Sequence, residues 1–219
     1  MRPMASSTPP LQMFPGPSVA ANPLINEHLP AYAGLKAFFA RLEEELVLKE
    51  QKEDEAWIPR VGVYLFGGLA AHLYTGEHPT TTIHATLAYP IRVPEDFHVM
   101  VPLPGGVSTM KMAASPRAQD LRWPGMGEGF EINLPLGVES FGVRVVQPLD
   151  LVVSMCTYFT PEEEAHVASI VRAGLITGSN FDFAWKQSFR EDAPSARDRE
   201  IHAQVLSMLA QHTPGSSLD

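Results

Sequence analysis

The sequence contains a single cysteine, Cys156, so an internal disulfide framework is excluded. One thiol suits a reducing cytoplasm, and its place in an apolar helical pattern is typical of a core residue rather than a nucleophile. The chain also lacks the run of about 18 apolar residues that a membrane-spanning helix needs. Residues 1–23 hold one basic residue, Arg2, and prolines interrupt their apolar stretches, which is a poor match to a signal peptide. We therefore expect a cytoplasmic protein.

Basic residues are scarce, since 16 Lys and Arg stand against 25 Asp and Glu, for a formal net charge of −9. A surface that follows nucleic-acid phosphates needs clustered Lys and Arg, so direct nucleic-acid binding is not expected. A protein partner or self-association fits an acidic chain better. The sequence also lacks the G-x-S-x-G and G-x-x-x-x-G-K-[ST] motifs, so it gives no support for an α/β-hydrolase or a P-loop enzyme.

Proline, in contrast, is abundant, with 20 residues, and many of them lie in the N-terminal leader and the middle loops. We interpret residues 1–28 as a Pro-rich arm that is either flexible or held by a partner.

Residues 29–147 are predicted to form an α/β core. Leu35, Phe38, Phe39 and Leu42 recur at helical spacing, and the β-rich run that follows them ends at a glycine pair. Residues 108–129 are rich in proline and glycine and are expected to be irregular. The predicted helices of this part are Pro30–Lys52 and Leu69–Tyr74, and the predicted strands are Val61–Phe66, Thr80–Tyr89, Phe97–Leu103, Phe130–Leu136 and Gly142–Val146.

Residues 148–219 are predicted to form a helical region packed on the core. Pro161 suits the first turn of a helix, and Glu162 to Glu164 suit its positive end, where they are interpreted as a solvated helix start. The predicted helices are Leu149–Tyr158, Pro161–Ala173, Phe181–Phe189 and Ala196–Gln211. The expected fold class is therefore α+β, with a small mixed sheet and flanking helices.

Three segments carry a resemblance to a known family. Val63–Tyr74 reads as a strand, a glycine pair and a helix, Val145–Ser154 as a strand that enters a Pro-x-Asp-Leu helix, and Phe159–Ile176 as the next helix. In this order they resemble the nucleotidyltransferase superfamily, in its bacterial branch near the AbiE-type toxins, over residues 35–190. The resemblance implies a nucleotidyltransferase-like core.

The resemblance also implies which residues would bind the nucleotide and its metal. Gly67 and Gly68 match the glycine pair that lets the backbone approach the triphosphate. Two aspartates of the next strand hold divalent metal in such enzymes, and their positions match Thr82 and His84. Magnesium prefers hard oxygen ligands, so neither residue replaces a metal-binding carboxylate.

Further matched positions have lost their charges. The family's helix lysine matches Met155, an arginine matches Tyr158, and two acids match Glu163 and His166, of which only Glu163 is charged. We therefore predict a scaffold that has kept its fold and lost its catalytic residues, with no catalytic residue and no cofactor expected.

Several of these residues also have a purely structural interpretation. Gly67-Gly68 is either a tight turn between strand and helix or a retained nucleotide-binding element. His84 is interpreted as a hydrogen-bonded strand residue rather than a metal ligand, and Asp150 as a local cap or ion pair. The remaining histidines match no zinc spacing, so we predict no metal site from His72, His78, His84 and His98.

Three functions follow as hypotheses. The first is an inactive nucleotidyltransferase-fold protein that acts by binding a protein or a nucleotide; the resemblance alone suggests an accessory role in a mobile element, plasmid or defence system. The second is an active toxin-type nucleotidyltransferase, which would need magnesium, a nucleoside triphosphate and substitute acids among Glu95, Asp96 and Glu131, the last being a possible residual acid. The third is an antitoxin-like partner of an active relative.

Overall fold

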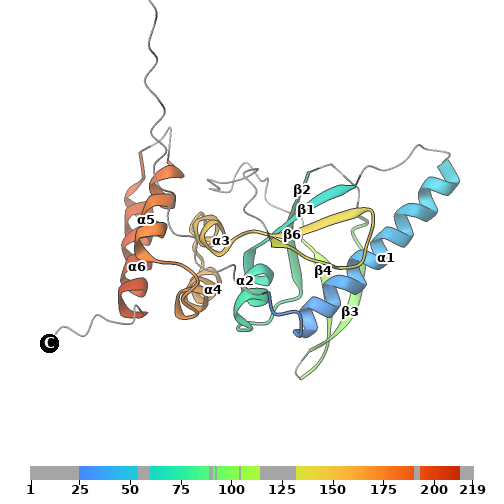
Figure 1. The fold of residues 1–219 in the computed structure, drawn as a ribbon, viewed down its shortest axis with the longest axis horizontal. Coiled ribbons are helices and arrows are strands. Elements are labelled where there is room, and N and C mark those ends of the chain that lie inside the picture. Colours follow the sequence, from blue (N-terminus) through green and yellow to red (C-terminus); the bar gives the residue numbers. More distant parts are fainter. Residues whose placement is uncertain are drawn as a thin grey trace, which may run out of the picture.

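A mixed β-sheet with helices on its flank and at one end forms the body of the molecule (Figure 1). The computed structural model describes residues 25–53, 60–88, 91, 93–103, 105–113, 132–189 and 193–212. Within these residues there are six strands and six helices: α1 (Pro30–Glu53), β1 (Val61–Phe66), α2 (Gly67–Thr75), β2 (Thr82–Leu87), β3 (His98–Leu103), β4 (Gly106–Met112), β5 (Ile132–Asn133), β6 (Phe141–Val145), α3 (Pro148–Met155), α4 (Pro161–Arg172), α5 (Gly178–Gln187) and α6 (Ala196–His212).

The strand order in the sheet is β3-β4-β2-β1-β6-β5. Two neighbouring pairs, β1 with β6 and β2 with β4, are parallel, and the other three pairs are antiparallel. The central strand β1 buries every second side chain, namely Val61, Val63 and Leu65, while Gly62 and Tyr64 are partly exposed. This alternation follows from the period of two in a strand and gives the sheet one strongly apolar face.

Helix α1 packs its aromatic residues against the sheet. The Phe38 ring meets Phe97 edge-on at 4.9 Å between centroids, and the Phe39 ring lies 5.4 Å from that of Phe141. Both phenylalanines of α1 are fully buried. The helix therefore joins two distant parts of the sheet, the β3 side and β6.

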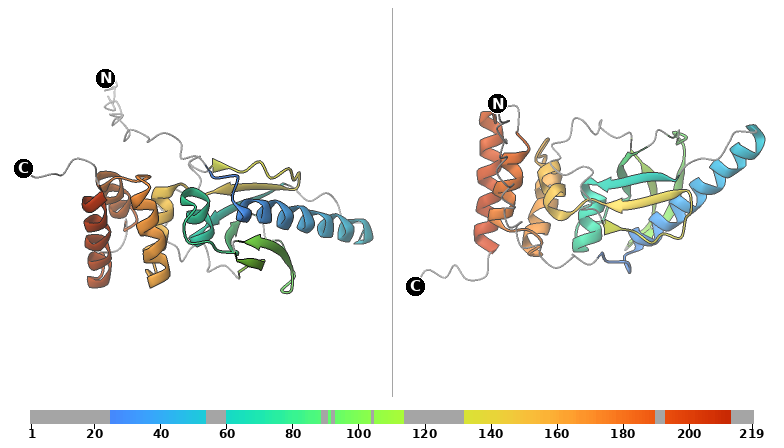
Figure 2. Two further views of the ribbon diagram at one scale, coloured as in Figure 1. Left: turned by 90° about the horizontal axis from the view of Figure 1, so that it is seen from below. Right: turned by 45° about the horizontal axis from the view of Figure 1, so that its top comes forward.

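The remaining helices lie at one end of the sheet, with α5 and α6 side by side at the outer edge (Figure 2). Helix α2 is joined to the segment directly after β6 because the Tyr74 hydroxyl donates to the Val146 carbonyl at 2.9 Å. Helix α4 is joined to α6 because the Gln204 amide donates to a Glu164 carboxylate oxygen at 2.6 Å. No helix in the described part of the chain is both long and apolar enough to cross a membrane.

The helix predictions agree with the structure apart from their ends. Helix α2 begins at Gly67 rather than Leu69. Helix α5 begins at Gly178 rather than Phe181, because the Thr177 hydroxyl accepts from the Asn180 N–H and caps the helix earlier. The expectation of irregular structure from residue 108 is wrong for residues 108–112, which belong to β4.

Of the predicted strand Phe130–Leu136, the described residues 132–136 form a strand only at Ile132 and Asn133, which make up β5. The Leu134 N–H still donates to the Val143 carbonyl of β6 at 2.9 Å, but the Leu136 N–H turns back to the Leu134 carbonyl. Of the predicted N-terminal arm, residues 1–24 lie outside the described residues.

Candidate functional site

A cavity of about 260 Å³ lies where the end of β1 meets the helices. Segments far apart in the sequence form its wall, which brings together the glycine pair, β2, the end of α3 and the first turns of α4. The lining residues are Phe66, Gly67, Gly68, His84, Ser154, Met155, Tyr158, Thr160, Glu162, Glu163 and His166. Of the positions singled out in the sequence, Thr82 does not line the cavity.

The glycine pair forms the sharp turn from β1 into α2. Gly67 has a φ of +69°, which is the left-handed region where residues with a Cβ are strained. At Gly68 the constraint is space, because an added Cβ would lie 2.5 Å from the His166 Nε2 atom. Both glycines therefore have structural reasons in this fold, whatever the cavity binds.

His84 stands on β2 directly opposite Phe66 in the strand register, and the two ring centroids are 6.0 Å apart. Burial lowers the pKa of His84, and the nearby Glu162 and Glu163 carboxylates only partly oppose this effect. The imidazole is therefore neutral at neutral pH. Thr82, two residues earlier on the same strand, has its backbone N–H bonded to the Thr80 hydroxyl at 3.3 Å.

The end of α3 contributes side chains without charge. Met155 is buried, whereas 45% of Tyr158 is exposed. The Ser154 hydroxyl donates to the Leu151 carbonyl of its own helix at 2.8 Å, so it is already bonded. Arg197, on α6, donates to the Tyr158 carbonyl at 2.7 Å and fixes the backbone at this rim of the cavity.

Asp150 lies in the first turn of α3, whose N-cap residue, Gln147, makes no side-chain cap hydrogen bond. Burial and then the Asp150 carboxylate raise the pKa of Tyr74. Cys156 is a buried thiol at the end of the same helix and forms no disulfide, as predicted.

The first turn of α4 forms a capping box. The Glu163 N–H donates to the Thr160 hydroxyl, and the Thr160 N–H donates to a Glu163 carboxylate oxygen at 2.7 Å. Glu162, in contrast, points into solvent, with 80% of its side chain exposed, and its carboxylate lies 3.9 Å from the His166 Nε2 atom. Glu162 is thus the lining acid that is free of the helix cap.

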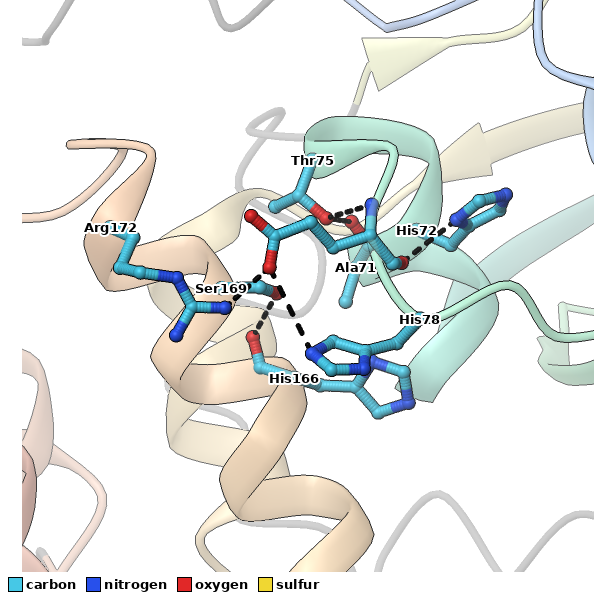
Figure 3. Close-up of polar contacts among 8 residues, drawn as sticks. Ala71, His72, Thr75, His78, His166, Ser169 and Arg172 are labelled. Carbon is cyan, nitrogen blue, oxygen red and sulfur yellow. Dashed lines mark hydrogen bonds and ion pairs between the residues drawn. The ribbon is translucent and has the colours of Figure 1, made fainter.

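His166 is a deeply buried polar side chain of the cavity wall, with 4% of its side chain exposed, and Ser154 is buried to a similar extent. Among the residues that the structure describes, the His166 Nδ1 atom has no hydrogen-bond partner. The ring of His78, a residue with a φ of +50°, meets it edge-on at 5.5 Å (Figure 3). Burial, followed by the neighbouring His78, lowers the pKa of His166; Glu162 opposes the shift and His72 adds to it.

A small network holds His78 over the His166 ring (Figure 3). His72 contacts the Glu77 carbonyl through its Nδ1 atom at 2.8 Å. The Glu77 carboxylate pairs with Arg172 of α4 and lies 3.9 Å from the Nε2 atom of His78. The loop after α2 is therefore tied to α4 through the Glu77–Arg172 ion pair and to its own helix through His72.

The lowered pKa of His166 predicts a pH dependence of stability. Below the ordinary pKa of 6.5, the unfolded chain takes up a proton that the folded chain does not. The free energy of unfolding therefore decreases as the pH is lowered, until the folded-state pKa is passed. His166→Leu is expected to flatten this slope in urea titrations between about pH 5 and about pH 7.5. The pKa of His84 is also lowered, so the variant keeps part of the pH dependence of stability. An unchanged slope would contradict the prediction.

The residues present do not fit the magnesium that the resemblance implies. His84 offers nitrogen where a carboxylate oxygen is needed, and Thr82 lies outside the lining. Across the described ranges, no group of three or more His, Cys, Asp or Glu is arranged to hold a metal ion.

The other acids and histidines named from the sequence lie elsewhere. Glu95 and Asp96 are exposed in the turn before β3, and neither lines the cavity. His98 contacts the Asp96 carbonyl at 2.6 Å, a local interaction. Glu131 lies outside the described residues.

Sequence reasoning missed four residues of the cavity wall: Phe66, Ser154, Thr160 and Glu162. The string Thr160-Pro-Glu-Glu163 matches the capping-box pattern, in which an acid follows a threonine by three positions. That signal would have located the start of α4 and identified Glu163, rather than Glu162, as the acid bonded to the helix end.

Comparison of the chain with protein-family models, with curated proteins and with solved structures gives no match.

Proposed function

We propose that this chain is a non-catalytic protein with a nucleotidyltransferase-like core that acts by binding a partner. The observation that carries the proposal is the composition of the cavity wall. The position that the resemblance matches to a metal ligand carries His84. The position matched to a lysine carries Met155, and the position matched to an arginine carries Tyr158. Among the described residues that line the cavity there is no Lys and no Arg.

This composition disfavours transfer of a nucleotidyl group. Such a reaction needs divalent metal and cationic side chains to neutralise the charge on the phosphates. Here the cavity presents two neutral imidazoles and the carboxylates of Glu162 and Glu163, which repel a triphosphate. The volume of about 260 Å³ is also below the range of roughly 300–1,000 Å³ that is typical of sites for drug-sized ligands.

The proposal is tested by calorimetric titration with ATP, GTP, CTP and UTP, each with and without magnesium. A label-transfer assay on total RNA and protein runs on the same sample. We expect neither magnesium-dependent binding nor transfer of label. Transfer of label would overturn the proposal in favour of an active enzyme, whereas nucleotide binding without transfer would make the chain a nucleotide sensor.

A further inference from the structure

We propose that the cavity binds the guanidinium group of an arginine side chain on a partner protein. This inference rests on the proposed function and adds the chemistry of the ligand. It reverses the charge preference that the resemblance implies, because a nucleotidyltransferase pocket binds an anion, while this one is built to receive a cation.

The wall of the cavity carries acidic side chains. Glu162 stands at the rim with its carboxylate in solvent, and Glu163 lies beside it with one oxygen bonded to the helix cap. The described residues of the lining hold no Lys or Arg that would neutralise these acids. A cation that enters the cavity thus meets an acid that is not paired with a lysine or an arginine of the wall, and the formal net charge of −9 favours its approach from a distance.

His166 has unused hydrogen-bonding capacity. Its side chain is 4% exposed and belongs to the cavity wall, and within the described part of the chain its Nδ1 atom has no partner. A buried polar atom without a partner costs free energy, and because Nδ1 is itself closed off from solvent, a ligand supplies the missing bond when the His166 ring turns that atom toward the cavity. Because the imidazole is neutral, one ring nitrogen is an acceptor, which suits a ligand made of N–H donors.

The wall also offers aromatic surface, and the cavity is small. Tyr158 is 45% exposed at the cavity, and Phe66 and His84 add further ring surface. A guanidinium is planar, carries five N–H donors and stacks on aromatic faces, whereas an ammonium is compact and strongly hydrated. A cavity of about 260 Å³ suits one side-chain end better than a drug-sized molecule.

The test uses N-acetyl-arginine amide as the probe, and N-acetyl-citrulline amide, its neutral isostere, as the control ligand. Binding to the full chain is followed by NMR through the imidazole signals of His84 and His166. We expect saturable shifts with the arginine probe and none with the citrulline probe. Agmatine and a capped Gly-Gly-Arg-Gly-Gly peptide then distinguish a free small cation from a polypeptide, and tighter binding of the peptide is expected.

Variants connect the binding to the cavity. Glu162→Gln removes an exposed charge and is expected to weaken the arginine probe about threefold to fivefold, the size of a partly exposed ion pair. Glu200→Gln, the same change at an exposed position on α6, is expected to have no effect. Tyr158→Ala is expected to weaken binding to a similar extent as Glu162→Gln.

Several results would overturn the inference: no saturable binding of the arginine probe, equal binding of the citrulline probe, or equal affinity in the Glu162→Gln variant. Tighter binding of agmatine than of the peptide would overturn the choice of a protein partner. The label-transfer assay keeps the two proposals apart. Transfer of label overturns the proposed function, whereas absent arginine binding without transfer overturns this inference alone.

Discussion

Phe38→Ala is expected to lower the free energy of unfolding by about 3–5 kcal/mol. The Phe38 side chain is fully buried and meets Phe39 and Phe97 edge-on, at 5.5 Å and 4.9 Å between ring centroids. Its removal leaves a cavity between α1 and the sheet and loses two aromatic contacts. Urea denaturation followed by circular dichroism measures the change.

Phe183→Ala provides the matched control, because 58% of Phe183 is exposed on α5. Its stability is expected to stay within about 0.5 kcal/mol of the wild type. A loss below about 1 kcal/mol in Phe38→Ala would contradict the packing of α1 described above.

The burial of Phe38 belongs to the part of the fold that the sequence predicts well. Apolar residues at helical spacing locate α1, and the run Val61–Phe66 locates β1, because each pattern records which side of the element is buried. Helix α4 is predicted almost to the residue, since Pro161 and the acids after it mark a helix start in any context.

Strand β4 was not predictable in the same way. Its burial pattern leaves most side chains exposed or half-exposed, and only Met110 is fully buried. What makes it a strand is pairing, with β3 through the hairpin and with β2 across a long stretch of sequence. A strand that depends on its neighbours carries little periodic signal of its own.

The site was predictable in position more than in chemistry. The resemblance drew attention to the glycine pair, His84, Met155, Tyr158 and His166, and all of them line one cavity. The exposure of Glu162 follows from the capping-box pattern, but no pattern predicts that His166 would be buried against Gly68. That burial depends on how α4 packs against α2, a contact between segments about a hundred residues apart in the chain.

Gly68→Ala is expected to lower the free energy of unfolding by about 1–3 kcal/mol, the usual cost of overpacking. The new Cβ would lie 2.5 Å from the His166 Nε2 atom, and the buried imidazole, held under His78, has little room to move. His166→Ala in the same chain removes the obstacle. The double variant is therefore expected to be more stable than the sum of the single effects allows, by about 0.5–3 kcal/mol.

Gly67→Ala separates this packing effect from backbone strain. Its cost, about 1–2 kcal/mol, comes from a φ of +69° rather than from His166, so His166→Ala is not expected to relieve it. Rescue at Gly68 without rescue at Gly67 would mean that one glycine is required by the imidazole above it and the other by the turn. Neither residue would then need a bound phosphate to explain its presence. Strictly additive effects at Gly68, in contrast, would mean that His166 plays no part in the requirement for glycine. Retained nucleotide binding would then again be an explanation for the glycine at this position.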